Sequence, residues 1–254
     1  MTRAEKAAIF LSLHVAGSPV VLYNVWDAGS AKAIAEAGAK AIATGSESVA
    51  AAQGFEDGQN IPMDVALSTA MQIISATDLP TTIDFEGGYA TSPAEITANV
   101  ARLIETGAVG LNFEDRIVGG TGLYDVDTQV DRIKAVRAAA KNQPFVINAR
   151  TDLFLQAGED TDHATLVDEA IARAARYKEA GADCFFVPLL SDTGLIRRIC
   201  DAVALPVNVM VLDQDADLQP LREAGVARIS YGPAPYLAAY RAITDSARNV
   251  FKLS

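Results

Sequence analysis

The sequence contains few of the side chains that most redox and transition-metal sites use. Only two cysteines, Cys184 and Cys200, and two histidines, His14 and His163, occur among 254 residues. Two cysteines do not suffice for a disulfide framework, and we expect both to act as small core hydrophobes. The histidines fall in an expected N-terminal helix and at an expected helix start, away from strand ends. We therefore discount both as catalytic groups.

Long apolar runs and clusters of positive charge are also missing. No apolar run approaches the ~18 residues that span a bilayer, and the N-terminus lacks the order of regions of a signal peptide. We expect a soluble, cytoplasmic protein with no membrane partner. Lys and Arg total 21 against 32 Asp and Glu, a net charge of -11, which argues against a nucleic-acid partner. A net negative charge still permits an anionic small substrate, because a metal ion or one Arg can make the electrostatic potential of the site positive.

An alternation of apolar strands with helical segments dominates the rest of the chain. A Glu two residues before a Gly marks four helix ends, and each Gly fits a left-handed C-cap before an apolar run. After an N-terminal helix at 3–16, the pattern predicts eight strands, at 20–26, 41–44, 81–85, 109–113, 145–148, 184–188, 207–211 and 227–230. The helices that follow them are expected at 30–37, 63–77, 93–106, 128–141, 165–180, 195–203, 218–224 and 236–251.

Eight β/α units with near-continuous apolar strands predict an α/β fold, a single-domain (β/α)8 TIM barrel over residues 1–254 with an N-terminal cap helix. A doubly wound open sheet is the alternative, but no G-x-G-x-x-G turn follows the first strand. Two irregular stretches, 47–61 and 115–125, follow the second and fourth strands. Long βα loops lie at the catalytic face of a barrel, so both are candidate lids.

Carboxylates gather at the expected strand ends. Asp84 and Glu86 close the third strand at alternate positions, so their side chains should point to the same face. In another interpretation, Asp84 caps the next helix and Glu86 is solvated. Asp57, after the second strand, and Glu114, at the end of the fourth, would lie with them at the C-terminal end of the barrel. There the four negative charges would repel one another unless a cation neutralised them. Oxygen ligands of this kind suit a hard divalent ion, Mg²⁺ first.

Groups that could hold an anion lie at neighbouring strand ends. Arg150, after the fifth strand, could hold a substrate carboxylate in its fork of N–H donors, and Gly45 and Ser46 offer backbone N–H groups and a hydroxyl. The glycine cluster at 119–122 lacks the lysine of a phosphate-binding loop, so we interpret it as a flexible lid. Tyr124 or Asp125 would be placed to supply a proton when that lid closes.

These motifs together resemble the isocitrate lyase and phosphoenolpyruvate mutase superfamily over nearly the whole chain. The resemblance is carried by the segments Trp26-Asp27-Ala28-Gly29-Ser30-Ala31, Thr44-Gly45-Ser46, Asp84-Phe85-Glu86-Gly87-Gly88-Tyr89-Ala90, Glu114-Asp115-Arg116 and Asn148-Ala149-Arg150-Thr151-Asp152. Glu86 stands where the superfamily motif has a second Asp, and Arg116 where it has Lys or Gln.

The resemblance implies a Mg²⁺-dependent lyase, with Mn²⁺ as an alternative ion, that forms or discharges a metal-bound pyruvate-like enolate of a small 2-oxo or 2-hydroxy acid. The chemistry would be C–C bond cleavage or decarboxylation, in a homodimer or homotetramer whose last helix packs on a neighbouring subunit. The implied metal ligands are Asp57, Asp84, Glu86 and Glu114. The expected substrate contacts are Trp26, Thr44, Gly45, Ser46, Asp84 and Arg150, and the candidate catalytic residues are Arg150, Asp57 and Tyr124.

One departure from the superfamily pattern leaves the reaction open. Lyases of the superfamily carry a Lys-(Lys/Arg)-Cys-Gly-His loop after the fourth strand, whereas residues 117–124 contain no Cys, Lys or His. Pro188 stands where several members have a His at the end of the sixth strand. Phosphonopyruvate-type P–C mutase or hydrolase activity is therefore an alternative. A barrel that binds a 2-oxo acid without turning it over is another.

Overall fold

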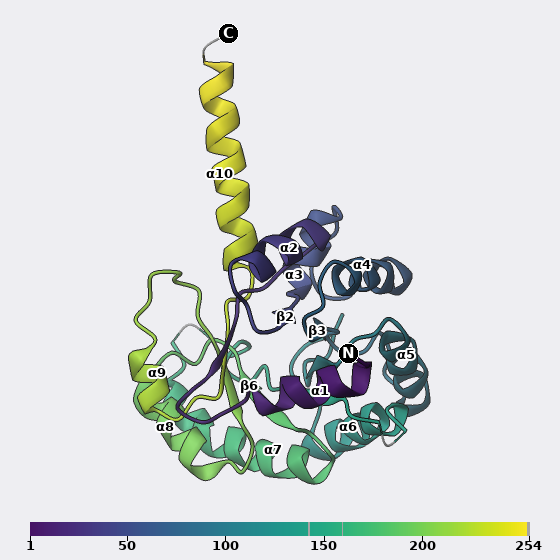
Figure 1. The fold of residues 1–254 in the computed structure, drawn as a ribbon. Coiled ribbons are helices and arrows are strands. Elements are labelled where there is room, and N and C mark those ends of the chain that lie inside the picture. The colour runs from purple at the N-terminus through teal and green to yellow at the C-terminus, as the bar shows by residue number, and fades with distance from the viewer. Residues whose placement is uncertain (142, 159, 253–254) are drawn as a thin grey trace.

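Eight short strands, each parallel to its neighbours, form one sheet in the order β1-β8-β7-β6-β5-β4-β3-β2 in a computed structural model that describes residues 1–141, 143–158 and 160–252. A parallel bridge between Val25 and Thr44, just beyond β1 and β2, joins the two edges. The sheet is thus a nearly closed barrel with helices around it (Figure 1), as predicted. The strands are β1 (Val20–Leu22), β2 (Ile42–Ala43), β3 (Thr81–Asp84), β4 (Gly110–Glu114), β5 (Val146–Arg150), β6 (Cys184–Val187), β7 (Val207–Met210) and β8 (Arg228–Ser230).

The helices agree with the predicted alternation except in one place. Most of them begin and end within about two residues of the expected positions. They are α1 (Arg3–Ser12), α2 (Ala28–Glu36), α3 (Ser46–Ala52), α4 (Met63–Ser75), α5 (Pro93–Glu105), α6 (Val126–Ala139), a 3-10 turn η1 (His163–Leu166) that leads into α7 (Val167–Glu179), α8 (Thr193–Ala202), α9 (Gln219–Glu223) and α10 (Ala234–Phe251).

Helix α3 corrects the prediction that 47–61 is irregular. It begins after Gly45, which has no side-chain cap, so the usual N-terminal signal is absent. Instead, Val49 and Ala50 are buried against Ile61 in a small cluster of their own. Tertiary packing rather than local sequence therefore stabilises this helix, which shortens the irregular part of the first candidate lid.

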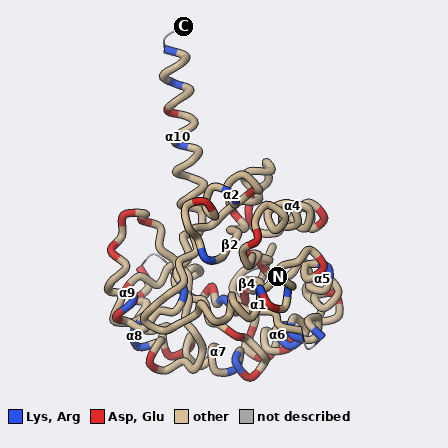
Figure 2. The backbone as a smooth tube through the Cα atoms, viewed as in Figure 1, with Lys and Arg blue, Asp and Glu red and all other residues tan. Residues whose placement is uncertain are grey.

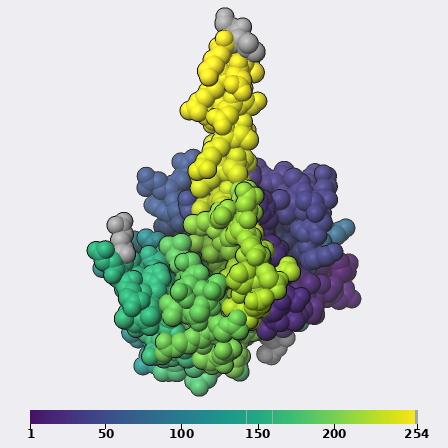
Figure 3. Space-filling view, turned by 90° about the vertical axis from the view of Figure 1, so that its left-hand side faces the viewer, coloured from purple at the N-terminus to yellow at the C-terminus, as the bar shows by residue number. Residues whose placement is uncertain are grey.

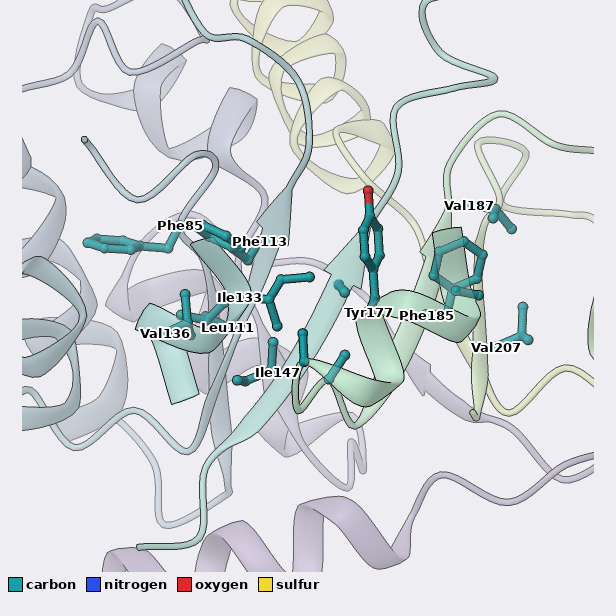
Figure 4. Close-up of a cluster of buried hydrophobic side chains, with 14 of the residues drawn as sticks. Phe85, Leu111, Phe113, Ile133, Val136, Ile147, Tyr177, Phe185, Val187 and Val207 are labelled. Atoms are coloured by element: carbon teal, nitrogen blue, oxygen red, sulfur yellow. The ribbon is translucent and has the colours of Figure 1, made fainter. Parts of the chain in front are cut away.

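The main core lies between the outer faces of the strands and the surrounding helices. Phe113, Ile147 and Phe185 from β4, β5 and β6 pack with side chains from α6 and α7, among them Ile133 and Tyr177 (Figure 4). These side chains are almost fully buried. Because burial of each large apolar side chain contributes about 1.5–3 kcal/mol, this layer holds the strand ends in fixed relative positions.

Helix α1 closes the N-terminal end of the barrel. Thr2 and Glu5 form a capping box at its start, and Ala7 and Phe10 pack against residues at the beginnings of strands, such as Val20 and Cys184. Access to the barrel interior is therefore from the other end, where the strands carry their C-terminal residues.

Helix α10 leaves the barrel instead of covering it. Its first three residues, 234–236, are buried, and the rest of this 18-residue helix projects from the body of the molecule (Figures 1 and 3). Lys and Arg are interspersed with Asp and Glu along α6 and α7 (Figure 2). Over the three described segments of the chain, no helix is both long and apolar enough to cross a membrane.

Candidate functional site

A cavity of about 240 Å³ opens at the C-terminal ends of the strands. Of the residues singled out from the sequence, its lining includes Gly45, Ser46, Asp57, Asp84 and Arg150. These come from the end of β3, the end of β5, the junction between β2 and α3, and the segment after α3, so the barrel brings together residues that are up to about a hundred positions apart in the chain.

Two hydrogen bonds position Asp84, and one of its carboxylate oxygens takes part in neither of them. Its backbone N–H donates to the Thr44 hydroxyl at 2.8 Å, and its Oδ2 accepts from the Ser46 backbone N–H at 3.2 Å. Oδ1 is buried and has no hydrogen-bond partner among the described residues. Burial raises the pKa of Asp84, although Arg150 opposes the shift. Since a buried carboxylate oxygen without a partner is costly, this atom marks a place for a cation or a donor.

Glu86 interacts electrostatically with Asp57 and Asp84, but its position is not set by strand β3. Strand β3 ends at Asp84, and Glu86 lies in a turn with a left-handed φ of 49°, so alternation along a strand does not account for its position. Its Oε2 accepts from the Gln59 backbone N–H at 2.8 Å. Burial, followed by the charges of Asp57 and Asp84, raises the pKa of Glu86 to about 8. The solvated interpretation is wrong, because only 3% of Glu86 is exposed.

The competing role for Asp84 is also excluded. The next helix, α5, is capped by Ser92, whose side chain accepts from the Glu95 backbone N–H. Asp84 is thus free of the capping role and faces the cavity instead.

Arg132 on α6 holds the turn that carries Glu86. Its guanidinium donates to the carbonyls of Gly87 at 2.8 Å and Ala90 at 3.1 Å. The ring of Tyr124 covers the same guanidinium at 4.2 Å. An arginine in a helix usually indicates a solvated face, so no sequence signal pointed to Arg132, of which only 2% is exposed.

Arg150 is already engaged before any ligand is considered. Its Nε and Nη2 donate to the two oxygens of Asp152, and Nη1 lies 3.2 Å from Glu114 Oε2. Asp152 therefore occupies one edge of the guanidinium fork, and the prediction that Arg150 holds a substrate carboxylate stays a prediction. A guanidinium has five N–H groups, so donors remain for an anion in the cavity that Arg150 lines.

A second layer of buried side chains fixes this arrangement. Asp115 accepts from the Asp152 backbone N–H at 2.9 Å, from the Tyr177 hydroxyl at 2.8 Å and from Arg173 at 3.2 Å. Asp115 thus positions Asp152, which positions Arg150. Among the described residues, the ion-pair partner of Asp115 is Arg173 and not its neighbour Arg116, which lines the cavity.

Three of the predicted substrate contacts and catalytic residues lie away from the cavity lining, as do the predicted metal ligands Glu86 and Glu114. The Trp26 ring packs edge-on against Tyr236 at 5.3 Å, and Tyr124 covers Arg132. Thr44 lies behind Asp84, with its hydroxyl occupied by the Asp84 N–H. Direct contact of these three with a substrate stays a prediction.

The donor set fits a hydrated Mg²⁺ better than a fully caged metal. Among the described residues, no group of three or more His, Cys, Asp or Glu side chains is close enough to hold a metal ion as it stands. Mg²⁺ keeps several waters and commonly binds through one or two carboxylates. Asp84 offers an oxygen that no described residue contacts by a hydrogen bond, and its carboxylate interacts electrostatically with those of Asp57 and Glu86. These residues, with Glu114, could hold the ion partly through water.

Comparisons with known proteins agree with this geometry. The model of a family described as phosphoenolpyruvate phosphomutase matches residues 10–251. An uncharacterized protein of Mycobacterium tuberculosis is 34% identical over 95% of this chain and 88% of its own length. The 2-methylisocitrate lyase of Escherichia coli is 29% identical over 93% and 80%. The structure of a provisionally named phosphonomutase from Burkholderia cenocepacia superposes with a TM-score of 0.94, at 46% identity over 97% and 99% of the two chains.

Proposed function

This chain belongs to the phosphoenolpyruvate phosphomutase family, and on that premise we propose that it is a Mg²⁺-dependent carbon–carbon lyase of a small 2-oxo or 2-hydroxy acid. Both lyases and a phosphomutase occur among the proteins that it resembles. The observation that carries the proposal is Asp84 Oδ1, a buried oxygen with no partner in the described part of the chain, on a residue that lines the same cavity as Arg150.

Each group has a distinct role in this proposal. Arg150 binds the substrate carboxylate through the donors that Asp152 and Glu114 leave free, and Asp152 keeps the guanidinium oriented. Asp84 contacts the ion, with Asp57 and Glu86 facing it. Bound there, Mg²⁺ would act as a Lewis acid that stabilises negative charge developing on the substrate oxygen. A phosphonopyruvate hydrolase of the same fold has been solved with oxalate and Mg²⁺, which supports the choice of ion.

P–C bond chemistry is the second candidate. The Burkholderia protein, at 46% identity, is provisionally named a phosphonomutase, and residues 117–124 contain none of the Cys, Lys or His of the lyase loop. Product analysis discriminates the two: incubation with phosphonopyruvate gives phosphoenolpyruvate or free phosphate only if the P–C bond is rearranged or cleaved.

We also propose that the protein is a homodimer or homotetramer assembled through α10. Leu237, Tyr240 and Ile243 on this helix are 42%, 49% and 65% exposed. In a regular barrel the last helix would cover β1, whereas here Val21 of β1 is 36% exposed beside an apolar groove that includes Tyr23. A neighbouring copy of α10 would cover such surfaces at the same time.

Calorimetry of pyruvate binding with and without Mg²⁺ tests the central proposal. We expect binding that requires Mg²⁺ and that is lost in Asp84→Asn, because this variant removes the charge beside the unpartnered oxygen. Asp78→Asn, at an exposed carboxylate before the start of β3, makes the same change of charge away from the cavity and should bind as the unaltered protein does. Binding that ignores both Mg²⁺ and Asp84→Asn would refute the metal site.

A further inference from the structure

The wall of the cavity has two chemically different halves that follow the order of the strands. The half built on β2, β3 and β4 includes Asp57, Asp84 and Arg116. The lining that follows β5 to β8 is mainly apolar and includes Leu155, Phe186, Pro188, Leu189, Met210 and Leu212. Because β6, β7 and β8 are hydrogen-bonded neighbours, their apolar residues form one continuous surface, which we call the apolar wall.

Ionisable groups are missing from the apolar wall. Among the described lining residues contributed by β6, β7, β8 and the segments that follow them, the polar side chain is Ser230, and its hydroxyl donates to Asn208 Oδ1 at 3.2 Å. A substrate carboxylate placed here would lose water without gaining a cation, which is strongly unfavourable.

The apolar wall begins next to Arg150, the group proposed to bind the substrate carboxylate, and its side chains are tightly packed. Phe186 is 4% exposed and lies 5.9 Å from the Arg150 guanidinium, so an acid held by Arg150 would have the wall next to it. Met210 packs onto Gly232, where an added Cβ would lie 2.6 Å from the Met210 sulfur. Only glycine at 232 allows Met210 to occupy this position.

At the rim, the wall exposes apolar surface in a strained conformation. Leu189 and Leu212 are 38% and 49% exposed, and Leu189 has a φ of 60°. A left-handed conformation is costly for a bulky residue, and such strain tends to occur where a ligand is clamped. Exposed apolar side chains that continue into a cavity are typical of a binding surface.

We propose that the substrate is a 2-oxo or 2-hydroxy acid whose far end is an alkyl or aryl group that packs on the apolar wall, with no second carboxylate there. This inference rests on the proposed function, since it takes Arg150 as the anchor of the acid. Among the described lining residues, Arg116 is the other cation, and it follows β4, on the charged half. A second anionic group would have to turn toward Arg116 and away from the wall.

Binding of matched 2-oxo acids in Mg²⁺-containing buffer tests this inference. In the series pyruvate, 2-oxobutanoate and 2-oxopentanoate, each added methylene should tighten binding about fourfold. The five-carbon dicarboxylate 2-oxoglutarate should bind at least about tenfold more weakly than 2-oxopentanoate, because its far carboxylate finds no partner on the wall. Calorimetry gives all four dissociation constants.

Two variants identify the surface responsible. Leu189→Asn keeps a residue that tolerates the left-handed backbone but removes the apolar side chain, and Leu212→Glu adds a charge at the rim. Each should lower the ratio of 2-oxopentanoate to pyruvate affinity severalfold. Met71→Glu, on α4 and 47% exposed away from the cavity, should leave that ratio unchanged.

The possible failures are distinguishable. If 2-oxoglutarate binds as tightly as 2-oxopentanoate, the inference is overturned while the proposed function stands, whether or not Arg116→Gln abolishes that binding. An affinity ratio unchanged in both wall variants would also overturn it. If no acid of the series binds, the proposed function itself fails.

Discussion

Replacement of His14 by Asn should change how the stability of the protein depends on pH. His14 is 8% exposed beneath the barrel, where its Nδ1 donates to the Phe10 carbonyl at 2.8 Å and its Nε2 has no partner among the described residues. Burial, and then the nearby charge of Arg228, lowers the pKa of His14 from 6.5 to about 4. The native protein therefore holds a neutral imidazole.

The sign and size of the effect follow from linkage. Between pH 6.5 and 4 the unfolded chain binds a proton that the native state does not, so stability is lost as the pH falls through this window. With pKa values of 6.5 unfolded and about 4 native, the loss between pH 7 and pH 5 is about 2 kcal/mol, and the limit below pH 4 is about 3 kcal/mol.

Urea unfolding of both proteins at pH 7 and pH 5 measures this difference. His14→Asn keeps a side-chain N–H able to reach the Phe10 carbonyl but does not titrate. Comparing the two proteins cancels the contributions that other titrating groups make to the free energy of unfolding. Glu86 is one of these groups, because its raised pKa makes stability fall as the pH rises from about 4.5 to about 8. The unaltered protein should lose about 2 kcal/mol more than the variant on going to pH 5. Parallel pH dependences would refute a buried neutral His14.

Two further predictions concern the site and the assembly. Asp152→Asn removes the charge that orients Arg150, and we expect pyruvate affinity measured by calorimetry to fall about tenfold, the effect of losing one charge-assisted contact. Asp168→Asn, at a surface ion pair, is the control, and equal affinities in both variants would contradict the role of Asp152. Ile243→Glu on α10 should lower the mass measured by light scattering, whereas an unchanged oligomer would show that α10 is not the interface.

The fold was predictable because its signals are local. Glycines such as Gly107 and Gly181 end helices with φ values of 97° and 104°, a conformation that favours glycine and so is visible in sequence. Strand and helix alternation then leaves few topologies other than a barrel. The strand-end position of Asp84 followed from the same reasoning.

The parts of the site that the sequence did not reveal depend on contacts between distant segments. The pair Asp115 and Tyr177 is separated by 62 positions, and Asp115 and Asp152 by 37. Helix α3 has no cap from its own N-cap residue, Gly45; it depends on packing and on the Asp84 carboxylate, which accepts from the Ser46 N–H across 38 positions. Trp26 stands within a motif that suggests substrate contact, and no sequence signal indicates that its ring packs on Tyr236 in α10, a partner 210 positions away.

Arg132 makes two loops mechanically dependent on each other. The same guanidinium holds the Gly87 carbonyl, next to Glu86, and carries the Tyr124 ring at the end of the β4–α6 loop. If the β4–α6 loop swings far enough to lift Tyr124, one face of Arg132 becomes open to water, and the turn that sets the Glu86 carboxylate loses part of its support. Opening of the cavity and loosening of the turn that carries Glu86 would then occur together. A substrate that closes the β4–α6 loop would therefore also fix the position of the Glu86 carboxylate.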